Sequence, residues 1–299
     1  MSINVFLVLG IGGLVGFLSG LFGVGGGFLL TPLMMMIGIP PAVAAASDSN
    51  QIVAAAASGA MAHTRMGNVD MKMGVVILLG GVAGGTLGVQ AVKILRQMGN
   101  FEFAVKAVYV LMLGLVGGAM FIESLRALRK TEPVGQITAG QPRFSRFFNR
   151  LPLKMHFKKS GLHTSAVFPF SIGATVGFLA ALMGVGGGFI MVPAMIYVIG
   201  MPTVVAIGTD LFQIVFTTAN VTLQQAITNH TVDIVLALVL LAGSTIGAQF
   251  GARVSKFLRG EQIRILLSMI VLALMVKLLF DLLLMPNNLV DLVAAKGGH

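Results

Sequence analysis

The stretch Gly20-Leu-Phe-Gly-Val-Gly-Gly-Gly-Phe-Leu-Leu-Thr-Pro32 returns later in the chain as Ala181-Leu-Met-Gly-Val-Gly-Gly-Gly-Phe-Ile-Met-Val-Pro193. Both copies lie inside apolar sequence, and the same landmarks follow each of them. Ser47-Asp48-x-x-Gln51 follows the first copy, and Thr209-Asp210-x-x-Gln213 follows the second. The chain is therefore a duplicated unit with a glycine run and a carboxylate in each copy. In lipid, helix breaks and carboxylates persist mainly where they line a cavity, so the pattern indicates a transport path.

The composition excludes a water-soluble globule. Hydrophobic residues make up 56% of the 299 and charged residues only 10%, whereas soluble domains carry about 25% charge. The mean hydropathy is +0.94. Apolar runs near the ~20 residues that cross a bilayer recur along the whole length, so we expect a multi-pass membrane protein. The first run has no basic segment before it and no small-residue cleavage site, which predicts a retained span.

The positive charge is concentrated in one loop. The net charge is +10, and almost half of the 20 lysines and arginines lie close together, at Arg126, Arg129, Lys130, Arg143, Arg146, Arg150, Lys154, Lys158 and Lys159. A cationic loop between spans is what the positive-inside bias produces, so we expect a cytoplasmic loop and no nucleic-acid partner. Within it, residues 144–157 are predicted to form a short amphipathic helix on the membrane surface.

The chain divides into a first membrane repeat (1–122), a basic cytoplasmic loop (123–164) and a second membrane repeat (165–299). Each repeat contains about five hydrophobic elements, which we place at 4–21, 26–38, 42–63, 71–95 and 102–122, and at 165–183, 187–200, 203–228, 232–255 and 261–285. The element that follows each glycine run is too short to span as a straight helix, so we expect it to be broken or re-entrant. Glycines spaced by four, such as Gly80, Gly84 and Gly88, predict close helix packing.

Charge favours one topology. If each short element returns the chain across the membrane, four basic residues fall on the cytoplasmic side, namely Arg253, Lys256, Arg259 and Arg264. Lys93, Arg96 and Lys106 then fall outside, against the rule. Each repeat has an odd number of crossings in this topology, so the two copies are inverted relative to each other. The predicted fold is an all-α polytopic membrane protein with two inverted repeats and Gly-rich broken or re-entrant helices.

The glycine runs are candidates for holding an anion. Neither run has the Lys-Ser/Thr pair of a phosphate-binding P-loop, which disfavours nucleotide binding. A helix that starts after such a run presents free N–H groups and the positive end of its dipole, and an anion is a natural ligand there. The candidate substrate-binding glycines are Gly25, Gly26, Gly27, Gly186, Gly187 and Gly188. The alternative is a glycine hinge that serves tight packing only.

Polar residues after the glycine runs are the second set of candidates. Ser47 and Gln51, like Thr209 and Gln213, share a helix face at i, i+4 spacing and are expected to donate hydrogen bonds to an oxyanion. An ionised carboxylate inside a membrane segment costs several kcal/mol, which makes Asp48 and Asp210 candidates for carrying a coupling proton. The alternative role for both carboxylates is structural, bracing the amides of the adjacent broken helix.

The paired Gly-x-Gly-Gly-Gly-Phe-x-x-x-Pro motif, with Ser/Thr-Asp-x-x-Gln after it, resembles the sulfite exporter TauE/SafE family of membrane transporters. The resemblance covers about residues 10–122 and 168–285, and the matching positions are Gly23, Gly25, Gly26, Gly27, Pro32, Asp48, Gln51, Gly184, Gly186, Gly187, Gly188, Pro193, Asp210 and Gln213. It implies an inner-membrane carrier of sulfur-containing anions such as sulfite or sulfonates. It leaves the substrate and the direction of transport open.

We therefore expect a secondary transporter that moves a small sulfur oxyanion by alternating access, with proton coupling through the two aspartates. An anion channel, and a carrier of other small organic anions, remain as alternatives. The chain has no cysteine, and its five histidines show no metal-ligand spacing. No catalytic Ser/His/Asp set can be read either, so we expect neither an enzyme nor a cofactor or metal. The oligomeric state stays open.

Overall fold

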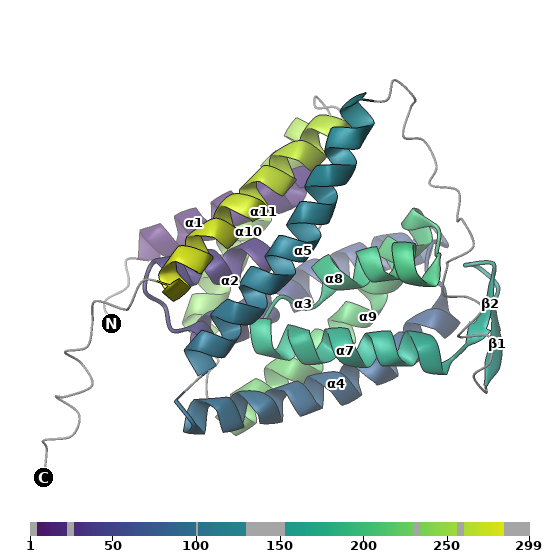
Figure 1. Ribbon diagram of the computed structural model, residues 1–299, viewed down its shortest axis with the longest axis horizontal. Helices are drawn as coiled ribbons and strands as arrows, with labels where there is room; N and C mark the ends of the chain where they lie inside the picture. Colours follow the sequence, from purple (N-terminus) through teal and green to yellow (C-terminus); the bar gives the residue numbers. More distant parts are fainter. Residues whose placement is uncertain are drawn as a thin grey trace, which may run out of the picture.

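The computed structural model describes residues 5–22, 27–99, 101–129, 153–229, 234–255 and 260–283, which form helices and one short β-ribbon (Figure 1). The first repeat contains α1 (Val5–Phe22), α2 (Gly27–Met36), α3 (Pro41–Arg65), α4 (Met71–Gln97) and α5 (Phe101–Arg129). The second contains α7 (Val167–Met183), α8 (Gly188–Pro193), η1 (Ala194–Ile199), α9 (Thr203–Gln224), η2 (Gln225–Asn229), α10 (Ile234–Ser255) and α11 (Gly260–Leu283). The predicted helical elements are confirmed, and α5 runs well past its expected end.

The basic segment contributes a β-ribbon to an otherwise helical structure. Strands β1 (Lys154–Phe157) and β2 (Leu162–Ser165) pair antiparallel. Gly161 in the turn between them has a φ of 66°, a conformation that glycine adopts without strain. The prediction of an amphipathic helix over 144–157 is wrong for Lys154–Phe157, because the glycine turn lets these residues pair with β2. Residues 144–152 lie outside the described ranges, and the division of the chain at 122 and 164 stays a prediction.

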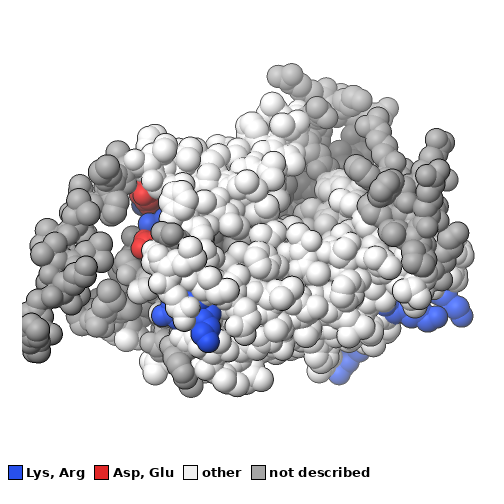
Figure 2. All heavy atoms as spheres, turned by 60° about the horizontal axis from the view of Figure 1, so that its bottom comes forward, with Lys and Arg blue, Asp and Glu red and all other residues white. Residues whose placement is uncertain are grey.

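The surface of the helices is suited to lipid. In the described ranges, four helices are long and apolar enough to cross a membrane, Met71–Gln97, Phe101–Ala119, Thr203–Asn229 and Ile265–Leu283, and shorter apolar helices accompany them. Large apolar side chains such as Phe6, Leu87 and Phe280 are exposed. On the face shown in Figure 2, charged side chains gather toward the two ends, with an uncoloured expanse between them. The chain is therefore a multi-pass membrane protein.

Helices from the two repeats pack against each other through glycines. α1 lies along α10, and α4 lies along α7, so the first helix of each repeat contacts the fourth helix of the other. A Cβ atom added to any of these glycines would meet a backbone carbonyl of the facing helix: Gly80 and Phe170, Gly84 and Ala174, Gly243 and Leu9, Gly247 and Gly13. The predicted packing role of the four-residue glycine spacing is confirmed.

The remaining helices pair with their own counterparts. α3 packs against α9, and α5 packs against α11. Contacts later in one helix fall earlier in the other. Gly59 and His63 of α3 meet Leu211 and Gly208 of α9, and Gly114 and Gly117 of α5 meet Met275 and Val271 of α11. Both pairs are therefore antiparallel. The α3–α9 pair crosses the centre of the molecule, and its two helices carry the aspartates and glutamines that the sequence singled out.

Asp70 fastens the β-ribbon to the helices. Its Oδ1 accepts a hydrogen bond from the backbone N of Met73 (3.2 Å), which caps the start of α4. Its Oδ2 accepts from the backbone N (3.0 Å) and from Oγ (2.8 Å) of Ser160 in the ribbon turn. Lys159 Nζ also donates to the carbonyl of Gly67 (2.6 Å). One buried carboxylate thus ties the ribbon to one end of the bundle, which we call the ribbon end.

Replacing Asp70 by alanine is expected to lower the free energy of unfolding by about 1–2 kcal/mol, because the helix cap is lost. The ribbon also loses its anchor, so trypsin should cut faster after Lys158 and Lys159. Ser160→Ala keeps the cap and the bond from its own backbone N, so it should cleave more slowly than Asp70→Ala. Cleavage of Asp70→Ala at the wild-type rate would mean that other contacts hold the ribbon.

Candidate functional site

The second glycine run ends one helix and begins another. Gly184, Gly186 and Gly187 have φ values of 75°, 71° and 87°, in the left-handed region that glycine favours. The backbone N of Gly184 donates to the carbonyl of Ala180 (2.7 Å) and closes α7. The carbonyl of Gly187 accepts from the backbone N of Ile190 (3.0 Å) and of Met191 (2.8 Å) in the first turn of α8. The predicted helix break is confirmed here.

The helix that starts after this break runs back toward the ribbon end. The α8–η1 segment extends over Gly188–Ile199, about 18 Å at 1.5 Å per residue, and the hydrocarbon core of a bilayer is about 30 Å thick. Met195 and Ile199 share a buried cluster with Phe157 and Phe168, which lie in the ribbon and at the start of α7. The segment therefore returns to the end from which α7 came, as Figure 1 also shows.

The starts of α2 and α8 meet at the centre of the molecule. The rings of Phe28 and Phe189 stack with their centroids 4.2 Å apart and their planes 12° apart. Ile52 of α3 and Ile214 of α9 lie beside them. A Cβ on Gly186 would stand 2.9 Å from Ile52 Cγ2 and 3.1 Å from Ile214 Cδ1. The glycines predicted to bind substrate thus lie around this centre as far as they are described: Gly27, Gly186, Gly187 and Gly188; Gly25 and Gly26 lie outside the described residues.

Asp48 is fully buried beside α2. Thr31 Oγ1 donates a hydrogen bond to its Oδ2 (2.7 Å). Its Oδ1 is buried without a hydrogen-bond partner from the protein. A buried acceptor without a protein partner normally binds a proton, a water molecule or a ligand, so Oδ1 of Asp48 is free to bind one of these.

Asp210 occupies the equivalent place in the second repeat. It is buried, and Gln213 Nε2 donates to its Oδ1 (2.9 Å). A Cβ added to Gly188 would stand 2.9 Å from its Oδ2, so the carboxylate lies against the first residue of α8. Each predicted coupling residue therefore lies beside the short helix of its own repeat. Ile52 and Ile214 share one buried cluster and lie beside the glycines at the starts of these short helices.

The hydroxyl and amide groups differ between the repeats. In the first, Ser47 Oγ and Gln51 Oε1 are buried without a protein partner, while Gln51 Nε2 donates to Ser244 Oγ (2.8 Å). In the second, Thr209 Oγ1 accepts from the backbone N of Asp70 (3.0 Å), and Gln213 is bonded through both of its side-chain atoms. Of these four side chains, Ser47 and Gln51 are the ones with a buried atom that has no protein partner.

Sequence reasoning missed three buried polar residues that hold the site. Thr31 binds Asp48, Ser244 binds Gln51, and Tyr109 Oη donates to the carbonyl of Met183 (2.6 Å) at the end of α7. All three are isolated polar groups in apolar segments, and in a membrane such groups are usually hydrogen-bonded between helices. This rule predicts that each of the three side chains is hydrogen-bonded to another helix, but it does not predict which residue is the partner.

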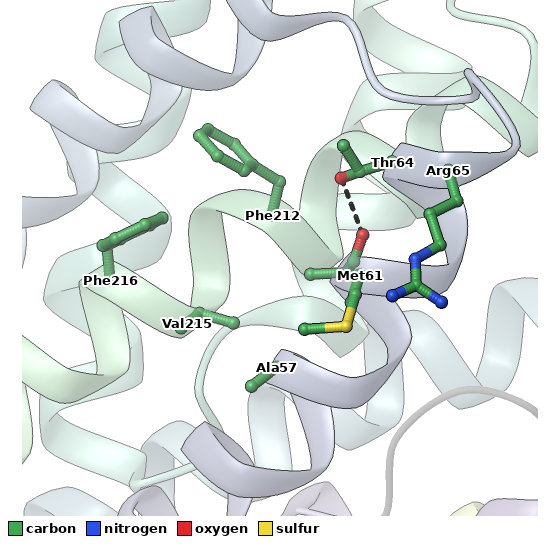
Figure 3. A pocket seen from close by; sticks show the side chains of 8 residues that line it. Ala57, Met61, Thr64, Arg65, Phe212, Val215 and Phe216 are labelled. Atoms are coloured by element: carbon green, nitrogen blue, oxygen red, sulfur yellow. Dashed lines mark hydrogen bonds between the residues drawn. The ribbon is translucent and has the colours of Figure 1, made fainter.

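A pocket of about 320 Å³ lies farther along the same two central helices (Figure 3). It is lined by Ala57, Ala60, Met61, Thr64 and Arg65 of α3 and by Phe212, Val215 and Phe216 of α9. Its walls are mainly apolar, and Thr64 Oγ1 donates to the carbonyl of Ala60 (2.7 Å) within α3. The pocket does not include the predicted site residues. Arg65 at its edge is its one charged lining residue.

Fold and site together describe a multi-pass membrane protein with broken helices and polar groups gathered at its centre, which is the architecture of a membrane transporter. The sequence comparisons agree with this class. Residues 8–278 match the family described as "Sulfite exporter TauE/SafE". Because the match covers most of the chain, the chain belongs to this family.

The chain is also similar to bacterial proteins named as transporters. It is 24% identical over 289 residues to the probable membrane transporter protein YunE of Bacillus subtilis (strain 168), covering 94% of this chain and 98% of the relative. It is 30% identical over 250 residues to a probable membrane transporter protein of Xylella fastidiosa (strain 9a5c), covering 83% and 84%. The family and these relatives are transporters, not enzymes. No solved structure matches the chain.

Proposed function

We propose that the chain is a secondary transporter of sulfur-containing anions, such as sulfite or a sulfonate, in the cell membrane. One observation carries this proposal. Beside the glycine-started helix α2, three buried polar atoms have no protein partner: Ser47 Oγ, Asp48 Oδ1 and Gln51 Oε1. Family membership supports a sulfite-like substrate. A sulfur oxyanion presents several acceptor oxygens, to which the Ser47 hydroxyl, a protonated Asp48 and backbone N–H groups can donate, whereas Gln51 Oε1 can only accept a hydrogen bond.

The binding residues would come from both repeats. Backbone N–H groups at the starts of the short helices, and hydroxyl and amide side chains on α3 and α9, would contact the anion: Gly25, Gly26, Gly27, Ser47, Gln51, Gly186, Gly187, Gly188, Thr209 and Gln213. Ser47 has an unpartnered hydroxyl, and the Thr209 hydroxyl accepts from Asp70 N and keeps its own hydrogen to donate. Gln51 Nε2 and Gln213 Nε2 already donate, to Ser244 and to Asp210, and would have to exchange that bond for the anion. We therefore expect Ser47 and Thr209 to make the first side-chain contacts with the anion.

Asp48 and Asp210 would couple transport to protons. An ionised carboxylate repels an anion held close to it, and the repulsion is strong in a medium of low dielectric constant. A protonated Asp48 would instead donate a hydrogen bond from Oδ1, the oxygen that has no partner. The proton would neutralise the carboxylate that repels the anion, and the bound anion would in turn stabilise the protonated carboxyl group. Binding of either one would therefore favour binding of the other.

Inverted repeats would give this site access to each side in turn. The antiparallel contacts of α3 with α9, and the matching α1–α10 and α4–α7 pairs, support repeats related by a two-fold axis. Two conformations can then arise by exchanging the roles of the repeats around a fixed centre. The short helices α2 and α8 would move with their own repeats.

The test is uptake into proteoliposomes that hold the purified protein, with labelled sulfite and with a simple sulfonate, each with and without an imposed pH gradient. Saturable uptake that a pH gradient drives is the expected result, and protein-free liposomes give the background. Conduction of many ions per second without saturation would favour an anion channel. Absence of flux for both anions would remove sulfur anions as the substrate and direct the search to carboxylates.

A further inference from the structure

Polar side chains form a line along α9 and η2, on the side that packs against α4 and α7. Its members follow one another at spacings of one to four residues: Asp210, Gln213, Thr217, Asn220, Gln224, Gln225 and Asn229. From 210 to 229 the line is about 28 Å long at 1.5 Å per residue, close to the thickness of the hydrocarbon core. We call this set the polar line of α9.

The first part of the line is hydrogen-bonded to Asp210. Gln213 Nε2 donates to Asp210 Oδ1 (2.9 Å), and Thr217 Oγ1 donates to Gln213 Oε1 (2.9 Å). All three side chains are almost fully buried. This part of the line leads away from the ribbon end, because Thr209 lies next to Asp70.

The last part of the line reaches the opposite end of the molecule. Gln224 Nε2 donates to Asn220 Oδ1 (3.1 Å), and Asn229 Nδ2 donates to Gln225 Oε1 (2.6 Å). Arg96 Nη1 at the end of α4 donates to the carbonyl of Asn229 (2.9 Å), and the residue is exposed. The line therefore joins a central carboxylate to a charged, accessible surface.

The middle of the line has polar atoms that the protein does not satisfy. Thr218 Oγ1, Asn220 Nδ2 and Thr222 Oγ1 are buried without a partner. Beside them, Thr217 packs closely on α4, because a Cβ added to Gly81 would stand 2.8 Å from Thr217 Oγ1. Buried polar atoms in this state are normally hydrogen-bonded to water.

The first repeat repeats the line only in part. When Asp48 is aligned with Asp210, alanines stand in α3 at the positions of Thr217, Thr218, Thr222 and Gln224, whereas Ser58 and His63 stand at those of Asn220 and Gln225. Both central helices pack in equivalent places, so a need for helix contacts alone would act on both of them. The difference associates the line with one of the two carboxylates.

We propose that the polar line of α9 is a proton path between Asp210 and the membrane face at which Arg96 lies. The proposal rests on the proton-coupled transport proposed above and adds the route by which a proton reaches the second carboxylate. Threonine hydroxyls both donate and accept hydrogen bonds, and amide side chains can hydrogen-bond to ordered water molecules through their N–H and C=O groups. A proton that enters from water at the Arg96 end forms an O–H bond on an Asp210 carboxylate oxygen. The same bond breaks when Asp210 releases the proton.

The other titratable groups on the packed elements lie toward the ends of the line or on α3. In the described ranges they are Asp70, Lys72, Lys93 and Arg96 on or beside α4, Asp48, His63 and Arg65 on α3, and Tyr197 in η1. The described residues of α7, and those of α4 between 73 and 92, carry none. A proton that travels along the middle of the line therefore meets no competing acceptor on the described parts of α4 and α7 that face it, and Asp48 of α3 is the other central carboxylate.

Thr217→Val tests the path because it replaces a hydroxyl by a methyl group of the same size. Thr245→Val is the matched control: Thr245 Oγ1 donates to the carbonyl of Leu241 (2.7 Å) within α10, on an exposed face. Thr217→Ser keeps the hydroxyl and tests rescue. Each purified variant is assayed in proteoliposomes for sulfite counterflow at equal pH, which needs no net proton movement, and for uptake driven by a pH gradient.

We expect Thr217→Val to keep wild-type counterflow and to lose pH-driven uptake by about tenfold, the change in rate that about 1.4 kcal/mol produces. Thr217→Ser and Thr245→Val should behave like the wild type in both assays. Wild-type pH-driven uptake in Thr217→Val overturns the path, and so does loss of counterflow, since it would place Thr217 in the substrate route or the fold. Wild-type protein that transports the anion without a pH effect refutes the path alone, whereas wild-type protein with no flux refutes the proposed function.

Discussion

Gly184→Ala is expected to abolish folded protein in the membrane. Gly184 has a φ of 75°, where a residue with a Cβ costs about 1–2 kcal/mol. The added Cβ would also overlap the backbone of Ala45 in α3, and backbone atoms cannot move aside as a side chain can. Because the two effects add at the point where α7 gives way to α8, the break cannot form. The measurement is the amount of monodisperse protein in detergent by size-exclusion chromatography.

Two other glycines separate the two effects. Gly38 has a φ of 87° with open space around it, so Gly38→Ala carries the backbone strain alone and should cost only about 1–2 kcal/mol. Gly118 in α5 has neither feature, and Gly118→Ala should match the wild type. If Gly184→Ala were no worse than Gly38→Ala, the close contact with Ala45 would not be needed for the fold.

Asp48→Asn and Asp210→Asn are expected to abolish the response of transport to pH while leaving folded protein in the membrane. Asparagine keeps the size of the side chain and an oxygen that can accept the bonds from Thr31 or Gln213, but it cannot take up and release a proton near neutral pH. Uptake with a pH gradient should fall to the level seen without one. The assay is labelled sulfite uptake into proteoliposomes at matched protein content.

The matched control for both is Asp281→Asn, the same chemical change at an exposed position near the end of α11. It should leave the pH response at the wild-type level. An unchanged pH response in both central variants would assign the two aspartates to bracing the short helices. A loss in only one of them would place coupling in one repeat.

The helix breaks and the close-packed helix faces were predictable because they depend on local sequence. Three glycines in a row cannot hold a helix, and glycines four apart necessarily share a face. The confirmed break at Gly184–Gly187 and the contact between Gly84 and Ala174 follow from these rules. Family membership was predictable for the same reason, since its motif is contiguous.

The partners of the site residues were not predictable because they depend on how distant segments meet. Thr31 binds Asp48, yet its counterpart in the second glycine motif is Val192, so the duplication hides it. The ribbon was missed because the apolar and basic residues near 154 also fit an amphipathic helix. Gly161 allows a tight turn, but the turn favours a strand over a helix only because β1 pairs with β2. The pairing of α1 with α10 likewise has no local signal.

That pairing has a consequence for how the protein is made. α1 is synthesised before α10, on which its glycine face packs, and α10 begins only at Ile234. The helices between the two must be synthesised before α1 meets its partner, and contacts so distant in sequence form late. Until then, α1 presents its small-residue face to lipid or to the insertion machinery. The α1–α10 contact therefore forms only after α10 has entered the membrane, and a chain that stops before Ile234 leaves α1 without its partner.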